Sequence, residues 1–268
     1  NNSKKKVNKM GKVTFEEMLN AGVHFGHLKR KWNPHMSPYI FDEKKGIHII
    51  DLNKTLVKLE EAANAMKQIA KSGRKILFVA TKKQAKEIIS SKVDEINMPS
   101  ITERWPGGML TNFKTTRKTV KKMSSIDKMM KDGTADTMSK RERLQLTRQR
   151  EKIGKVFGSI SDMNRLPAAI FIVDVKKEHI ALAEARNLNI PVFAMVDTNS
   201  NPNDIDFVIP SNDDATKSIE LIITNLCDAI KEGLGERKQS KEKIAKEKAA
   251  KEEKAVEAAE KSNEEVKS

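Results

Sequence analysis

Three short apolar runs constrain the fold of this chain more than any other feature. They occupy residues 75–81, 167–174 and 190–197, and each is nearly continuous in apolar residues between its ends. Strands buried on both faces of a parallel sheet have this composition, whereas strands with one solvated face alternate. Before the first run, from residue 53 to 73, apolar residues recur at helical spacing. The order predicts an α/β domain with a mainly parallel sheet.

A strongly charged segment, residues 109–166, interrupts this order of strands and helices. It holds nine Lys and six Arg against six acidic residues. Its apolar residues follow a narrow helical seam. These seam residues are Phe113, Val120, Met123, Ile126 and Met130, then Leu146, Ile153, Val156, Ile160 and Met163. We therefore predict a basic, antiparallel coiled-coil hairpin inserted into a discontinuous α/β domain, residues 13–108 and 167–235.

The charge of the predicted hairpin favours a nucleic acid as its partner. The whole chain carries a formal charge of +14, and self-repulsion in such a hairpin is relieved by a polyanion. A solvated charged face is the alternative, because Lys and Arg are ordinarily exposed. The hairpin residues predicted to bind RNA are Lys114, Arg117, Lys118, Lys121, Lys122, Arg141, Arg143, Arg148 and Arg150.

Further RNA contacts are predicted on the α/β domain. Residues 21–41 mix Gly and Pro with cations and aromatic rings, which suits phosphate binding and stacking. The predicted helix start after residue 81 and the junction at 103–108 add further cations and a ring. The predicted contacts are Lys29, Arg30, Trp32, Lys82, Lys83, Arg104 and Trp105. For Trp32, packing in the core is an equal alternative.

Capping residues predict where the helices begin and end. A capping box is expected where Ser or Thr is followed three residues later by Glu or Gln. The predicted boxes are Thr14 with Glu17, Thr81 with Gln84, and Ser139 with Glu142. Asn53 is predicted to cap the helix that ends at Gly73. Residues 47–51, 99–103 and 207–210 are predicted to be the shorter strands of the sheet.

Catalytic and metal-binding motifs are weak in this sequence. Cys227 is the single cysteine, which excludes a disulfide framework and a multi-thiolate metal site. His24 and His27 lack partners at the fixed spacing that zinc sites use, so we predict no metal and no cofactor. Asp197 and the acidic residues after it are predicted to satisfy a tight turn. Two alternatives stay open: a phosphate-substrate α/β enzyme with its site near Thr81 and Asp197, and a free RNA-binding regulator.

The remaining predictions concern location, partners and the chain ends. No apolar run reaches the ~18 residues of a membrane span, and the basic start lacks the apolar core of a signal peptide, which predicts a cytoplasmic protein. Residues 1–12 carry five Lys and no acid and are expected to be disordered. Residues 236–268 are expected to form a charged helix or a disordered tail. In the acidic part, residues 167–235, Asp213 and Asp214 are predicted to face a protein partner.

Several motifs resemble the ribosomal protein two family of the small ribosomal subunit. They include AGVHFGH at 21–27, WNPHMSPYIF at 32–41, ILFVATKKQA at 76–85, RWPGGMLTNFKT at 104–115 and IPVFAMVDTNSNP at 190–202, in collinear order. The resemblance implies a three-layer α/β/α fold with a flavodoxin-like sheet interrupted by a coiled-coil hairpin. It also implies a non-enzymatic role on the ribosome. The implied partners are small-subunit (16S-type) ribosomal RNA, neighbouring small-subunit proteins and ribosomal protein one, the messenger-binding protein.

Overall fold

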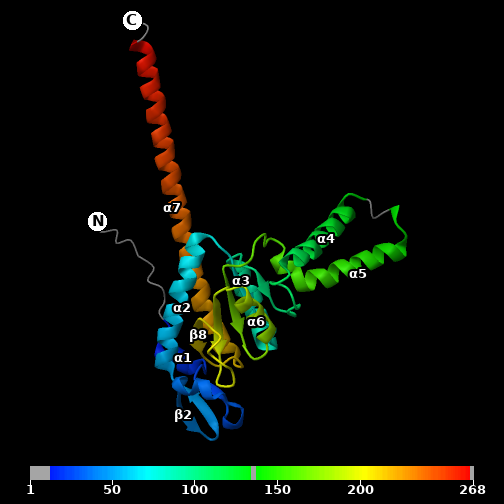
Figure 1. Cartoon of the computed structure of the whole chain (residues 1–268), viewed down its shortest axis with the longest axis vertical. Coiled ribbons are helices and arrows are strands. Elements are labelled where there is room, and N and C mark those ends of the chain that lie inside the picture. Colours follow the sequence, from blue (N-terminus) through cyan, green and yellow to red (C-terminus); the bar gives the residue numbers. More distant parts are fainter. Residues whose placement is uncertain (1–12, 134–136, 266–268) are drawn as a thin grey trace.

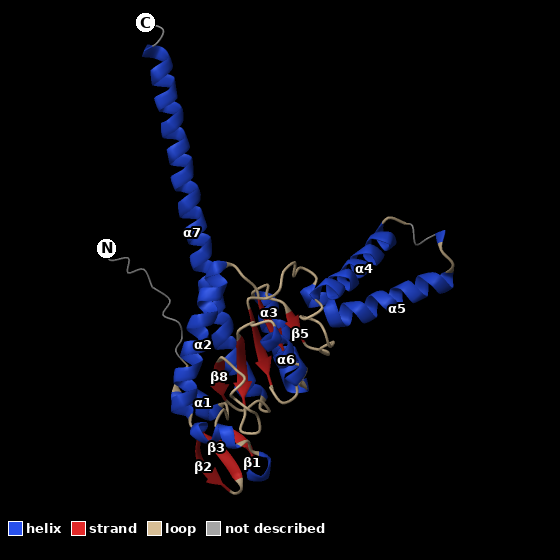
Figure 2. Ribbon diagram, viewed as in Figure 1, coloured by secondary structure: helices blue, strands red, loops and turns tan. Residues whose placement is uncertain are grey.

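The computed structural model of the chain describes residues 13–133 and 137–265. The basic arm predicted at residues 1–12 lies outside the described residues. Figures 1 and 2 show a body of strands and helices from which a pair of helices and a long C-terminal helix project. Across the part of the chain that the structure describes, no helix combines the length and apolar character needed to cross a membrane.

A five-stranded parallel sheet forms the centre of the body. Its strand order is β5-β4-β6-β7-β8, and each neighbouring pair is parallel. The strands are β4 (Ile76–Val79), β5 (Ser100–Ile101), β6 (Ala169–Val173), β7 (Val192–Val196) and β8 (Phe207–Pro210). Every residue of β4, β6 and β7 is buried. Burial on both faces explains why these three runs lack polar alternation, and the parallel sheet is confirmed.

Helices cover both faces of this sheet (Figure 2). The body helices are α1 (Phe15–Asn20), α2 (Leu52–Ser72), α3 (Lys83–Glu95), α6 (His179–Asn187) and α7 (Thr216–Glu265). Phe78, Phe171 and Phe193 share one core with α2, α3 and α7, whereas Leu77 and Ile172 share the other with α6. Because alternate strand residues point to opposite faces, these two cores produce the predicted three layers, α/β/α.

The segment before α2 forms a separate antiparallel sheet. Its strand order is β1-β3-β2, with β1 (Phe25–Leu28), β2 (Ile40–Lys44) and β3 (Ile47–Ile50). The prediction that residues 47–51 belong to the parallel sheet is therefore wrong. Along β3 half-buried and buried residues alternate, as expected for a strand with one solvated face, but so short an apolar run does not reveal its partners.

Two of the three predicted capping boxes are confirmed, those that begin at Thr14 and Ser139. The box predicted at Thr81 is wrong, because its backbone N–H and its hydroxyl both donate to Oε1 of Glu178. Helix α2 is capped by Asp51 instead of Asn53: the Asp51 carboxylate accepts from the backbone N–H of Asn53 at 3.0 Å. Which side chain satisfies the first N–H groups of a helix depends on the neighbours that the tertiary fold brings close. A local sequence motif does not specify those neighbours.

Helices α4 (Phe113–Lys131) and α5 (Lys140–Phe157) project from the body where the basic hairpin was predicted (Figure 1). Asp127 accepts a 2.8 Å hydrogen bond from Arg150 and so links the two helices. Several α4 side chains on the seam are buried, but no α5 side chain is fully buried. Ile160, predicted as part of the seam, lies beyond α5 in the core of the body. The helix pair is present, whereas a continuous coiled-coil seam is not established.

Helix α7 continues from Thr216 to Glu265, so the backbone of the tail is helical up to that residue. It crosses α2 closely at Gly233, where a Cβ atom would lie 2.4 Å from the Lys67 carbonyl oxygen. Lys67 also pairs with Glu232 and Glu236 of α7 at 3.1 and 2.9 Å. These contacts fix the direction in which the long helix leaves the body.

Candidate nucleic-acid interface

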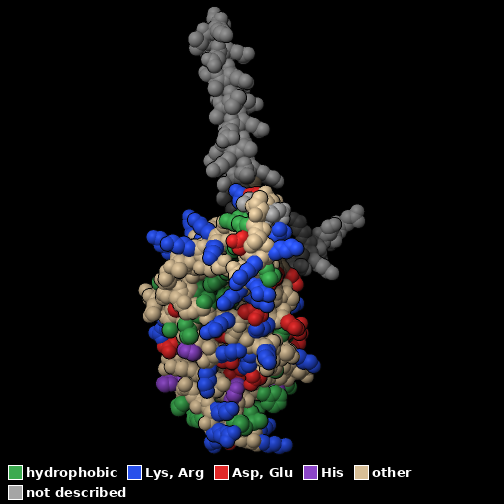
Figure 3. Space-filling model, turned by 90° about the vertical axis from the view of Figure 1, so that its right-hand side faces the viewer, with side chains coloured by type: hydrophobic (Ala, Val, Ile, Leu, Met, Phe, Trp, Pro, Cys, Tyr) green, Lys and Arg blue, Asp and Glu red, His purple; other side chains and the backbone are tan. Residues whose placement is uncertain are grey.

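Most predicted RNA-binding side chains of the hairpin are exposed. The exposed ones are Lys114, Lys118, Lys121, Lys122, Arg141, Arg148 and Arg150, and the half-buried ones are Arg117 and Arg143. Arg117 Nη1 donates to the Met163 carbonyl oxygen at 3.0 Å, which ties this side chain to the hairpin base. Figure 3 shows Lys and Arg side chains spread over the face from which the hairpin projects, with acidic side chains among them. Many separate exposed cations are the usual means of contacting a phosphate backbone.

On the body, the predicted contacts Lys29, Arg30, Lys83 and Arg104 are exposed. Lys29 pairs with Glu43 at 2.7 Å, but exposed pairs of this kind contribute little free energy and exchange partners readily. Trp32 is 37 % exposed and its ring centroid lies 5.1 Å from that of His48. One part of the indole therefore packs on the small sheet while another part faces solvent.

The prediction that Trp105 faces RNA is wrong. Its side chain is only 6 % exposed and lies in the core beneath the start of the hairpin. The indole Nε1 donates to Oε1 of Glu184 at 3.0 Å. A large ring whose single polar atom is satisfied internally anchors the junction and is not accessible for stacking on a base.

Glu184 on α6 organises the loop from which the hairpin starts. Besides the Trp105 indole, its carboxylate accepts from the backbone N–H groups of Gly108, Leu110 and Thr111 at 2.7, 2.9 and 3.1 Å. Burial by itself raises the pKa of a carboxyl group, but these hydrogen bonds lower the pKa of Glu184 below its ordinary value. The carboxylate is therefore ionised and holds four N–H donors of a single loop.

Sequence reasoning missed Glu184, although a signal was present. Ala181, Glu184 and Ala185 are spaced as one helix face, and that face is buried in α6. An acidic residue at a core-facing position requires buried donors. The glycine at the same loop is also explained, because Gly108 has φ of +81°, a conformation that favours glycine.

Lys82 lies at the centre of a cluster of carboxylates. Its Nζ is 2.8 Å from Asp213, 2.6 Å from Asp214 and 3.4 Å from Asp174, and its side chain is 13 % exposed. Its ammonium group is paired with these acids and is not free to bind RNA phosphates. Asp213 is fully buried, so the prediction that it faces a protein partner is wrong, whereas the Asp214 side chain is 53 % exposed.

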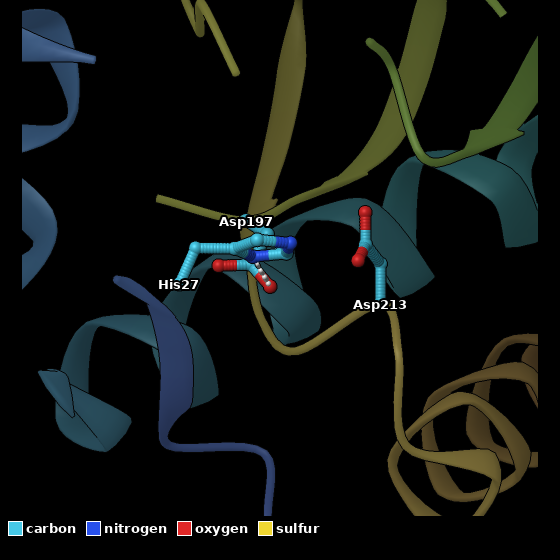
Figure 4. A group of neighbouring side chains, drawn as sticks. All are labelled: His27, Asp197 and Asp213. Carbon is cyan, nitrogen blue, oxygen red and sulfur yellow. Dashed lines mark ion pairs between the residues drawn. The ribbon is translucent and has the colours of Figure 1, made fainter. Parts of the chain in front are cut away.

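Figure 4 shows how His27 from the small sheet meets this cluster. Its Nδ1 lies 2.9 Å from Asp197 Oδ2 and its Nε2 lies 3.4 Å from Asp214 Oδ2. One donor atom each from His27, Asp197 and Asp213 lies within 4.8 Å of the others. Among the described residues, Oδ2 of Asp213 is one of the buried atoms without a hydrogen-bond partner. One imidazole and two carboxylates are a donor set that can hold zinc or a similar divalent cation.

The charges in this cluster shift one another's pKa values. Burial and the neighbouring carboxylates of Asp197 and Asp174 raise the pKa of Asp213 to about 7. Burial lowers the pKa of Lys82, but hydrogen bonds to Asp213 and Asp214 outweigh this and raise it above its ordinary value. A hydrogen bond to Asp197 raises the pKa of His27.

The same arrangement removes support for a phosphate-substrate enzyme. Both Thr81 donors bind Glu178, and the next residue, Lys82, is enclosed by carboxylates. Asp197 accepts from the backbone N–H of Thr198 at 2.5 Å and lies against His27. This end of the sheet is therefore acidic, and an anionic phosphate is repelled there.

Comparisons with known proteins agree with the architecture. The family model described as "Ribosomal protein S2" matches residues 18–233. "Small ribosomal subunit protein uS2" of Parabacteroides distasonis is 65 % identical over 232 residues, which cover 87 % of this chain and 84 % of that protein. The protein of the same description from Azobacteroides pseudotrichonymphae is 66 % identical over 228 residues, which cover 85 % of this chain and 87 % of its own. The chain therefore belongs to the ribosomal protein S2 family, whose members are proteins of the small ribosomal subunit with a structural, not enzymatic, role in translation.

Proposed function

We propose that this protein binds small-subunit ribosomal RNA mainly through the exposed cations of helices α4 and α5. The support is the density of positive charge on a pair of helices that stands clear of the body (Figure 1). Lys29, Arg30, Lys83 and Arg104 extend the cationic surface onto the body, and the exposed part of Trp32 can stack on a base. Lys82, Trp105 and Asp213 are not part of this surface, because the fold satisfies or buries them.

Neutralising two hairpin cations tests this proposal. For Lys118→Gln with Lys122→Gln, the slope of log affinity against log salt is expected to fall by about 1.4–1.8, since each phosphate contact contributes ~0.7–0.9. At 0.1 M salt the dissociation constant then rises about 25- to 60-fold. Filter binding of the full chain to small-subunit rRNA measures both quantities. The matched control is Lys176→Gln with Lys217→Gln, two exposed lysines elsewhere on the body. A wild-type affinity that does not change with salt would refute the proposal.

We also propose that the protein helps to hold ribosomal protein one, through an exposed apolar surface at the small sheet. Four large side chains there are strongly exposed: Phe15 at 43 %, Leu19 at 47 %, Phe25 at 49 % and Phe41 at 75 %. They line one hollow of about 570 Å³ between α1 and the small sheet. Contiguous apolar surface of this kind marks protein–protein contacts. We therefore assign the protein contact to this apolar surface and not to Asp213, which is buried. Asp214 is exposed, but it does not line this hollow.

Phe41→Ser is expected to weaken the binding of ribosomal protein one at least about tenfold, because exposed aromatic anchors carry much of the free energy of an interface. Folding should be unaffected, since three quarters of the Phe41 side chain is already in solvent. Surface plasmon resonance with purified small subunits depleted of ribosomal protein one provides the measurement. Ile180→Ser, an exposed apolar residue on α6, is the control. Equal affinity of the Phe41→Ser and control subunits would exclude this surface.

A further inference from the structure

A second cationic surface lies away from the exposed faces of α4 and α5. Helices α2 and α3 end close to the place where α7 leaves the body, and the three enclose a hollow of about 510 Å³. Five cations line it: Arg74, Lys75, Lys231, Arg237 and Lys238. Among the described residues, Glu95 is the one acid in the lining, and it pairs with Lys231 at 2.7 Å. We call this hollow the basic pocket; its lining carries a net charge of +4.

Some of these cations have structural roles. Lys75 Nζ donates to the carbonyl oxygen of Asn97 near the end of α3. The Arg237 guanidinium lies directly against Gly73, in the space that a Cβ atom would fill, at the residue that ends α2 in a left-handed conformation. Cations near helix C-termini are favourable in themselves. A ligand would therefore be bound by lining cations that make no such structural contact.

Arg74 and Lys238 are the lining cations that have no such structural role. Both are exposed. Among the side chains that the structure describes, no carboxylate lies within ion-pair distance of either one; Arg74 Nε makes a long, 3.4 Å contact with the Ser72 hydroxyl. Two uncompensated cations at the mouth of a hollow with further positive charge attract an anion of matching size.

The basic pocket is continuous with the base of the hairpin. An adjoining hollow of about 290 Å³ shares Lys75, Asn97 and Met98 with it and is closed on the far side by the segment that follows α5. The backbone connects the same places, because Ala168 N–H donates to the Lys75 carbonyl oxygen at 2.9 Å. At the hairpin end the Met163 carbonyl oxygen holds Arg117. The two hollows thus run from the crossing of α2 and α7 to a hairpin cation.

We propose that the basic pocket is a second phosphate-binding site for ribosomal RNA, reached by a strand that also contacts the base of the hairpin. The inference rests on the proposed RNA-binding function and adds a contact surface to it. Phosphates bind at Arg74 with Lys238, and from there the strand follows the connecting hollow to the base of the hairpin. The connecting hollow contains Asp94, Asp162 and two serine hydroxyls, which suits contacts to sugars more than to phosphates.

The test is the double variant Arg74→Gln with Lys238→Gln in the full chain. With small-subunit rRNA its salt slope is expected to fall by about 1.4–1.8, and its dissociation constant at 0.1 M salt to rise about 25- to 60-fold. Chemical probing of the rRNA should lose a set of protected nucleotides that the Lys118→Gln, Lys122→Gln variant retains. The matched control is again Lys176→Gln with Lys217→Gln. Far-ultraviolet circular dichroism verifies that each variant is folded.

The outcomes separate this inference from the proposed function. If the hairpin variant weakens binding and the pocket variant keeps the wild-type slope and protections, the basic pocket does not contact RNA and the inference is refuted alone. If the wild type itself binds rRNA without salt dependence, the proposed function fails and the pocket inference with it. A slope reduced equally by the pocket variant and by the body control would also refute the pocket, because the effect would then follow from net charge.

Discussion

Replacing Lys82 with Met lowers the free energy of unfolding by about 3–5 kcal/mol, because it leaves buried carboxylates without their counter-charge. Lys82 is 13 % exposed and pairs with three acids, of which Asp213 is fully buried. Removing one partner from such a cluster costs more than the pair contributed, since the remaining charges stay desolvated. Urea denaturation of the isolated protein measures the change. EDTA should be present, because a cation bound by the carboxylates would compensate for the lost ammonium group.

Two further variants identify the cause of this destabilisation. Lys83→Met changes the next residue, which is exposed, and should alter stability by no more than about 0.5 kcal/mol. Adding Asp213→Asn to Lys82→Met removes the buried charge and should restore part of the lost stability. If Lys82→Met is as stable as Lys83→Met, or if Asp213→Asn destabilises it further, uncompensated charge is not the cause.

Glu184→Gln is expected to lower the free energy of unfolding by about 2–4 kcal/mol and to weaken rRNA binding as well. The amide of Gln places an NH₂ group among four N–H donors that need an acceptor. The loop that carries Gly108 and Leu110 then loses its fixed conformation, and the hairpin loses its fixed direction relative to the sheet. Urea denaturation and filter binding give the two changes.

The effect on hairpin direction is measurable by electron paramagnetic resonance. Spin labels at Val57→Cys on α2 and Met129→Cys on α4 occupy exposed positions, while the native Cys227 is buried. Glu184→Gln should broaden the distance distribution, and Glu220→Gln, an exposed acid on α7, should not. Trp105→Phe combined with Glu184→Gln tests the contact itself, since the two should be coupled by about 1 kcal/mol. An unchanged distribution would show that other contacts orient the hairpin.

Strands and helices were predicted best where local composition reflects burial. The runs at β4, β6 and β7 could be assigned because strands covered on both faces have no polar alternation. The short strand β3 was placed in the wrong sheet, because four residues carry no information about which strands they pair with. The capping boxes at Thr14 and Ser139 were correct, whereas Thr81 found a more distant partner in Glu178.

The surface position of the exposed residues of the candidate site was predicted correctly, whereas the contacts of residues with partners far away in the sequence were not. Exposed cations such as Lys118 and Arg141 need no partner, so their surface position follows from charge and helical periodicity alone. Trp105 was expected to face RNA and is buried on Glu184, a contact between residues far apart in the chain. Lys82 was expected to bind phosphate and is enclosed by acids that follow β6 and β8.

By itself, the sequence determined the parallel α/β body and the position and charge of the hairpin, because both depend on local composition and periodicity. Only the tertiary structure decided which charged residues meet. His27 and Asp197 each lack metal-site partners in the sequence, yet the fold places them with Asp213 at one edge of the sheet (Figure 4). For the two acids the physical reason is topological: they follow β7 and β8, and loops at the carboxyl ends of parallel strands converge in space. His27 comes from the small sheet, whose contact with the same loop includes the 2.8 Å hydrogen bond from the His27 backbone N–H to the Thr198 hydroxyl.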